Sequence, residues 1–228
     1  MLDGLAIRLE KRMNKKLINW LGLLGVCALV SYICAAYFCR AAFPGYNWME
    51  QAVSDLSAES APSRQLWDKL STISSVGGIV CATCVAIFIS ERKVSTKLFR
   101  VGIYLFVIKG WISSIGYGMF ALDDAGKEIG GFSEVMHMVT TAFVVGLSII
   151  SLIILIIAGI KRKEVRDIGI WAGVTFAAML MGPRGMKALP PEYFGIGERF
   201  SIYAALVFDA ILGLYLFNGF RKAINTNQ

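Results

Sequence analysis

Residues 135–159 read VMHMVTTAFVVGLSIISLIILIIAG, and this stretch decides the fold class. A helix of roughly 20 predominantly apolar residues is long enough to cross the hydrocarbon of a bilayer. Five further apolar runs occur along the chain, at 17–39, 68–90, 101–120, 168–182 and 199–219. The sequence therefore predicts an all-α, polytopic membrane protein with six transmembrane helices in one bundle.

The charges between the runs predict how the bundle is oriented. The segments that share one side are 1–16, 91–100, 160–167 and 220–228, and they hold 15 of the 23 basic residues but only five acidic ones. The opposite segments hold seven basic and ten acidic residues. By the positive-inside rule, both termini are cytoplasmic, and the short loops favour a plasma (cell inner) membrane over a eukaryotic endomembrane. No exposed stretch combines basic and aromatic residues, so we expect no nucleic-acid partner.

Length and composition predict a single domain. We expect a basic amphipathic N-terminus at 1–16, a six-helix transmembrane domain at 17–220 and a cytoplasmic tail at 221–228. The first run is long enough to serve as an uncleaved signal anchor. The five cysteines lie in apolar runs, and their one C-x-x-C pair, Cys81 and Cys84, lacks a second ligand pair. We therefore expect no metal and no cofactor.

The first predicted outer loop carries the most informative motif, FPGYNWMEQAVSDLS, at residues 43–57. Pro44-Gly45 predicts a turn. Asn47 and Glu50 resemble a capping box, which predicts a short amphipathic helix that starts at Trp48. Two placements fit this helix. Either it lies in the membrane interface with Ser54 and Asp55 in solvent, or it turns these two side chains toward the mouth of the bundle.

The second outer loop places two acidic residues, Asp123 and Asp124, ahead of the only histidine, His137. His137 follows the loop by about one helical turn, so we expect it near the outer headgroup boundary and within reach of these aspartates. A single histidine rules out a three-histidine zinc site.

The third outer segment begins at Gly182-Pro183, which we expect to break the fifth run near the outer surface and to free the following residues to form a lid. Glu198 and Arg199 then enter the sixth helix in its first turn. Arg199 can either anchor this helix or bind a phosphate or carboxylate with two parallel hydrogen bonds.

Two charged residues, Lys109 and Asp209, fall inside the predicted membrane region, roughly 12–15 Å from the inner ends of their helices. An isolated charge at the bilayer centre costs at least ~2.5 kcal/mol, and a pair of opposite charges removes most of that cost. We therefore expect an intramembrane charge pair that places the third and sixth helices side by side.

The order of these motifs resembles a known family. Pro44-Gly45-Tyr46-Asn47 with Ser54-Asp55-Leu56-Ser57-Ala58, the acidic loop before His137, and Gly197-Glu198-Arg199 are similar to the domain-of-unknown-function 998 family of prokaryotic six-helix integral membrane proteins. The resemblance spans about residues 17–220. A more distant similarity links the chain to eukaryotic membrane proteins of lipid remodelling and autophagy. The resemblance implies fold and topology, whereas the activity of that family is unassigned.

Three classes of function remain open. The favoured one is an outward-facing polar pocket that recognises a lipid headgroup or small polar ligand, built from Ser54, Asp55, Asp123, Asp124, His137, Glu198 and Arg199. The second is an intramembrane lipid hydrolase or transferase, with His137 as general base and Ser54 or water as nucleophile. The third is a small carrier or accessory subunit that uses Lys109 and Asp209. Membrane lipids are the expected partners, and the sequence identifies no protein partner.

Overall fold

Helices make up the whole regular structure of the described chain. The computed structural model describes residues 15–123, 131–188 and 190–225, and it contains no strand within them. Six spans are long and apolar enough to cross a membrane, namely Leu17–Ala41, Arg64–Glu91, Lys97–Met119, Phe132–Lys161, Lys163–Gly185 and Pro191–Phe217. The predicted fold class, an all-α polytopic membrane protein, is confirmed. The predicted amphipathic N-terminus lies outside the described residues, apart from Lys15 and Lys16.

The helices coincide with the predicted apolar runs to within a few residues. The first span consists of α2 (Leu17–Leu21) and α3 (Leu23–Ala41), and the others are α4 (Arg64–Glu91), α5 (Lys97–Met119), α6 (Phe132–Lys161), α7 (Arg166–Ala188) and α8 (Phe194–Phe217). A last short helix, α9, covers Arg221–Asn225. The described residues also form three 3-10 helices, η1 (Ser54–Ser57), η2 (Lys163–Val165) and η3 (Pro191–Tyr193).

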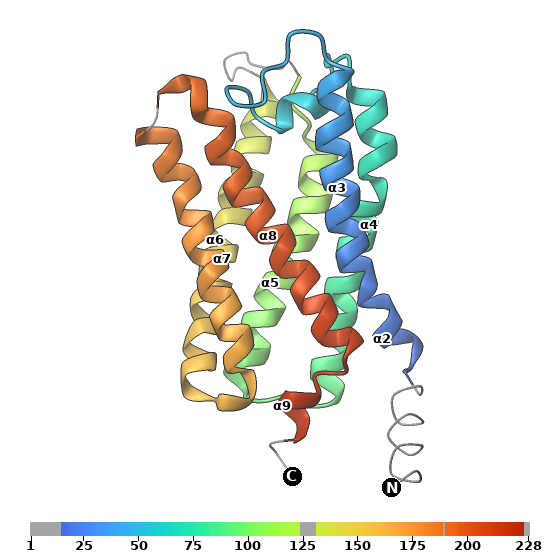
Figure 1. Cartoon of the computed structure of the whole chain (residues 1–228), viewed down its shortest axis with the longest axis vertical. Coiled ribbons are helices and arrows are strands. Elements are labelled where there is room, and N and C mark those ends of the chain that lie inside the picture. Colours follow the sequence, from blue (N-terminus) through green and yellow to red (C-terminus); the bar gives the residue numbers. More distant parts are fainter. Residues whose placement is uncertain (1–14, 124–130, 189, 226–228) are drawn as a thin grey trace, which may run out of the picture.

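The contacts between the spans describe a closed ring, which Figure 1 shows from the side. Each span contacts the next one in the chain, and α8 closes the ring against α3 while also contacting α4. The third and sixth spans, α5 and α8, are therefore not neighbours in the ring, and the expectation that they lie side by side was wrong. They approach each other through side chains inside the ring, where the rings of Phe106 and Phe208 pack edge to face at 5.0 Å.

Close helix contacts depend on glycine at two crossings. A Cβ atom at Gly213 of α8 would overlap the carbonyl oxygen of Gly22, which separates α2 from α3. A Cβ atom at Gly159 of α6 would lie 2.7 Å from the Cα atom of Gly169 in α7. Because apolar burial does not drive helix association in lipid, small residues that allow close backbone packing are a main source of bundle stability.

Helix α7 continues through Pro183 to Ala188, so the predicted break at Gly182-Pro183 was wrong. Proline has no N–H, and the carbonyl of Met179, four residues earlier, loses its usual helical donor. The hydroxyl of Ser201 in α8 donates to that carbonyl at 3.0 Å. Gly182 leaves room for Ser201, because a Cβ atom at residue 182 would overlap the Ser201 hydroxyl. A neighbouring helix thus satisfies the freed backbone group.

The connection between α3 and α4, residues 42–63, crosses the end of the bundle opposite the start of α2 and the end of α9, and we call it the strap (Figure 1). We call that end of the bundle the distal end. The predicted turn at Pro44-Gly45 is present, with Gly45 at φ +80° and a hydrogen bond from Tyr46 N to Phe43 O. The expected short outer helix is η1, which starts at Ser54 rather than at Trp48. The strap is therefore the segment that covers the distal end.

Candidate functional site

Arg199 fastens the strap to α8. Its side chain is 9% exposed and lies in the second turn of α8, because the helix begins at Phe194 rather than next to residue 199. Nη1 donates to the carbonyl oxygens of Gln51 at 3.0 Å and Gly195 at 2.8 Å, and Nη2 donates to the Tyr46 hydroxyl at 2.7 Å. Most of its donors are directed at protein atoms, which makes Arg199 an anchor of the strap.

Glu198 holds the next part of the strap. Its carboxylate accepts the backbone N–H of Val53 at 2.5 Å and the hydroxyl of Ser54 at 3.5 Å. Asp55 is also buried, and its carboxylate accepts the N–H of Ala52 at 3.2 Å. The distal end therefore brings together four of the predicted site residues, Ser54, Asp55, Glu198 and Arg199.

Tyr46 completes this cluster, although the sequence did not single it out as a site residue. Its hydroxyl donates to the carbonyl of Ala52 at 2.6 Å and accepts from Arg199. Burial raises the pKa of Tyr46 to about 12, although the nearby Arg199 lowers it in part. The phenol consequently stays neutral at physiological pH and serves as both donor and acceptor. The motif Pro44-Gly45-Tyr46-Asn47 includes this tyrosine, but nothing in the motif identified Arg199 as its hydrogen-bond partner.

His137 belongs to a second group, on the α5 and α6 side of the distal end. Its Nδ1 lies 2.8 Å from the carbonyl oxygen of Phe120, which can only accept, so Nδ1 carries the proton. The imidazole packs on the ring of Tyr117, whose hydroxyl donates to Thr141. Asp123 is exposed, and its backbone carbonyl accepts a hydrogen bond from the backbone N–H of Ser60 in the strap. Asp124 lies outside the described residues.

The predicted site residues thus form two groups rather than one pocket. Ser54 pairs with Glu198, and no contact in the described chain joins Ser54 to His137. The arrangement that a histidine-activated serine requires is therefore not formed. Among the described residues, no three histidine, cysteine or acidic side chains are grouped so that they could hold a metal ion.

Lys109 and Asp209 lie inside the ring of helices, close enough for their charges to interact. They do not form the direct ion pair that we expected, because within the described chain no ion pair or hydrogen bond joins them. The Lys109 ammonium instead lies 4.0 Å from the centre of the Phe106 ring. The ion pair is not formed because α5 and α8 are not adjacent in the ring of helices and face each other across its interior.

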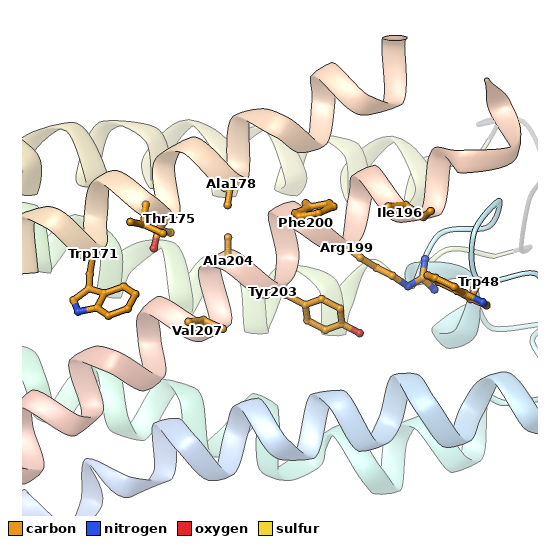
Figure 2. Close-up of a pocket in the computed structure, with 11 residues that line it drawn as sticks. Trp48, Trp171, Thr175, Ala178, Ile196, Arg199, Phe200, Tyr203, Ala204 and Val207 are labelled. Atoms are coloured by element: carbon orange, nitrogen blue, oxygen red, sulfur yellow. The ribbon is translucent and has the colours of Figure 1, made fainter. Parts of the chain in front are cut away.

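A groove runs along α7 and α8 from Arg199 at the distal end toward the middle of the bundle (Figure 2). It has a volume of about 430 Å³, and its walls are almost entirely apolar. The lining residues are Trp48, Trp171, Val174, Thr175, Ala178, Ile196, Arg199, Phe200, Tyr203, Ala204 and Val207. Arg199 and Trp48 lie at one end and Trp171 with Val207 toward the other (Figure 2). Sequence reasoning missed this groove, because no motif marks apolar residues that two helices bring together.

Replacing Arg199 by Met is expected to loosen the strap, because the carbonyls of Gln51 and Gly195 and the Tyr46 hydroxyl lose their donor. Hydrogen exchange at the amides of Val53 and Ile196, which the strap contacts protect, should accelerate by roughly tenfold or more, since a charged hydrogen bond contributes about 1.5–3 kcal/mol. Arg184→Met, at an exposed arginine of α7, is the control and should leave exchange unchanged. Unchanged exchange in Arg199→Met would show that the strap does not depend on this anchor.

The comparisons with known proteins identify a family and nothing closer. No curated protein and no solved structure matches the chain at a significant level. A family model matches residues 26–215, which include all six spans at least in part, the whole strap and both groups of polar residues. The chain therefore belongs to the family described as "Protein of unknown function (DUF998)".

Proposed function

We propose that the protein recognises a membrane lipid in the groove between α7 and α8, with one acyl chain along the apolar walls and the headgroup phosphate at Arg199. One observation carries this proposal: a long apolar groove ends at a buried arginine next to a tryptophan. Apolar walls with a few placed polar groups are typical of ligand sites, and 430 Å³ lies within their usual range of about 300–1,000 Å³.

The length of the groove fits the acyl chain of one leaflet. From Ile196 to Val207, α8 rises by roughly 16 Å at about 1.5 Å per residue. This is about half of the roughly 30 Å hydrocarbon core of a bilayer. Several lining side chains, including Val174 and Phe200, remain about half exposed, so the groove is open to lipid along its side. A lipid could therefore enter from its own leaflet without crossing the protein.

Arg199 retains donors for a phosphate. Three of its N–H groups bind the strap and α8, whereas Nε–H and the second Nη2–H have no partner among the described residues. An arginine that keeps two N–H donors suits a phosphate oxygen. The ring of Trp48 lies 6.0 Å from the guanidinium and marks the headgroup level, where tryptophan is enriched.

The distal end faces the outside of the cell in this proposal. The basic residues concentrate on the side of the two chain ends, which the positive-inside rule assigns to the cytoplasm. The lipid would accordingly come from the outer leaflet of a plasma membrane. The separation of His137 from Ser54 favours recognition over the hydrolase alternative.

A pair of adjacent alanines provides the test. Ala178 lines the groove, whereas Ala177 is exposed on the same helix and does not. Ala178→Trp should fill the groove and remove most of the lipid that native mass spectrometry detects on the gently purified protein, because the indole occupies the space of the acyl chain. Ala177→Trp adds the same side chain elsewhere and should retain wild-type lipid occupancy. Equal lipid retention by both variants would contradict the proposal.

A further inference from the structure

The interior of the ring holds a carboxylate that the protein leaves unsatisfied. Oδ1 of Asp209 is fully enclosed and has no hydrogen-bond partner among the described residues, where it is the one such side-chain atom. Lys109 is 8% exposed, and its ammonium has the Phe106 ring but no hydrogen-bond acceptor within the same residues. Two buried opposite charges therefore lie within electrostatic reach but out of contact.

Asp209 lies against a glycine of a neighbouring helix. The Asp209 carboxylate faces Gly78 of α4. A Cβ atom on Gly78 would lie 3.4 Å from Oδ2 of Asp209. Asp209 also keeps part of its surface accessible, although its Oδ1 atom is enclosed. Larger side chains at Gly78 would crowd the carboxylate, and glycine avoids this.

The chemistry of the two groups defines what would fit between them. A buried charge without a counter-charge or hydrogen bonds is costly, so each group is stabilised by a partner of opposite sign. A water molecule satisfies the hydrogen bonds but supplies no charge. An ammonium beside Asp209 and a carboxylate beside Lys109 satisfy both. We propose that Lys109 and Asp209 form a binding site for a small zwitterion, whose amine binds Asp209 and whose carboxylate binds Lys109.

Access to this site is one-sided. Toward the distal end the interior carries polar groups, among them Tyr32, whose ring packs edge to face on Tyr203 at 6.0 Å, and Glu198, which interacts electrostatically with Tyr32. Toward the chain ends, Phe106 and the part of α8 that follows Asp209 belong to a continuous apolar core that includes Leu212 and Leu216. We therefore expect a zwitterion to approach from the distal side, beneath the strap, and to stop at the charges, which describes a binding site and not a passage. The groove on α7 and α8 plays no part in it.

Thermal unfolding of the full-length protein in detergent tests this site. The probes are glycine, β-alanine and γ-aminobutyrate, which carry the same two charges at increasing separation. Acetate and methylamine, which carry one charge each, serve as controls. The zwitterion whose length matches the gap should raise the midpoint by about 5–10 °C at about 100 times its Kd. Acetate and methylamine should produce no comparable shift, because each leaves one buried charge unpaired.

Variants assign the shift to this site. Lys109→Met/Asp209→Leu removes both charges together and should fold but lose the shift. Lys69→Met, at an exposed lysine of α4, should retain it. The proposal is overturned if none of the three amino acids shifts the wild type, which would mean that water alone bridges the charges. It is equally overturned if the shift persists in the double variant or if a single-charge probe reproduces it.

Discussion

Lys109→Met is expected to destabilise the fold by about 3–5 kcal/mol, the cost of leaving a buried charge without its opposite. Asp209 is enclosed by helices, and Lys109 is the described cation whose charge acts on it. Removing the ammonium leaves a carboxylate with an unpartnered oxygen in a low-dielectric interior. Coulomb attraction is stronger at a given distance in such a medium than in water, so the two groups stabilise each other without touching.

Combining Lys109→Met with Asp209→Leu should recover most of that loss. Leucine is close to aspartate in shape, and well-packed apolar side chains replace a buried charge pair at little cost. Unfolding of the purified variants, followed by tryptophan fluorescence, measures the effect, and the single variant should lower the midpoint by roughly 10 °C. A midpoint for Lys109→Met within about 2 °C of wild type, or a double variant less stable than the single one, would refute the electrostatic coupling.

Gly213→Ala is expected to destabilise the bundle by about 3 kcal/mol, at the upper end of the range for overpacking. The added methyl group would overlap the carbonyl oxygen of Gly22 and lie 2.8 Å from Cys81 Sγ. The carbonyl oxygen of Gly22 belongs to the backbone, so the overlap can be relieved only if α2 and α3 move away from α8. That movement would open the contact that closes the ring of helices.

Gly173→Ala is the matched control, because it makes the same substitution in a helix of the same bundle with nothing within 4 Å of the added atom. Alanine favours helix over glycine by about 0.8–1 kcal/mol, so this variant should be slightly stabilised. Opposite signs for the two variants, measured by the same unfolding assay, are the expected result. Equal effects would show that the Gly22 and Gly213 crossing is looser than described.

The spans were predictable from sequence because a helix in lipid must carry apolar residues on most of its surface. The Pro44-Gly45 turn was predictable for a local reason, since the glycine at residue 45 adopts a positive φ that the turn requires. Both features depend on residues that are close in the chain. These two predictions were confirmed.

The features that were missed depend on residues far apart in the chain. Helix α7 continues through Pro183 because Ser201 supplies the missing donor, and no local pattern identifies that partner. Arg199 anchors the strap through the backbone carbonyl of Gln51, and any residue type offers such a carbonyl. The order of helices in the ring likewise depends on distant residues. The sequence predicted a similar depth for Lys109 and Asp209, but it did not predict that their helices are not adjacent.

Photo-crosslinking tests lipid recognition in the groove most directly. The purified protein would be incorporated into bilayers that contain a phospholipid with a diazirine on its acyl chain, irradiated, digested and mapped by mass spectrometry. We predict that adducts concentrate on the residues of α7 and α8 that line the groove, and that Ala178→Trp removes them while Ala177→Trp does not. Adducts spread evenly over the lipid-exposed faces of all six spans, unchanged by Ala178→Trp, would contradict a specific lipid site.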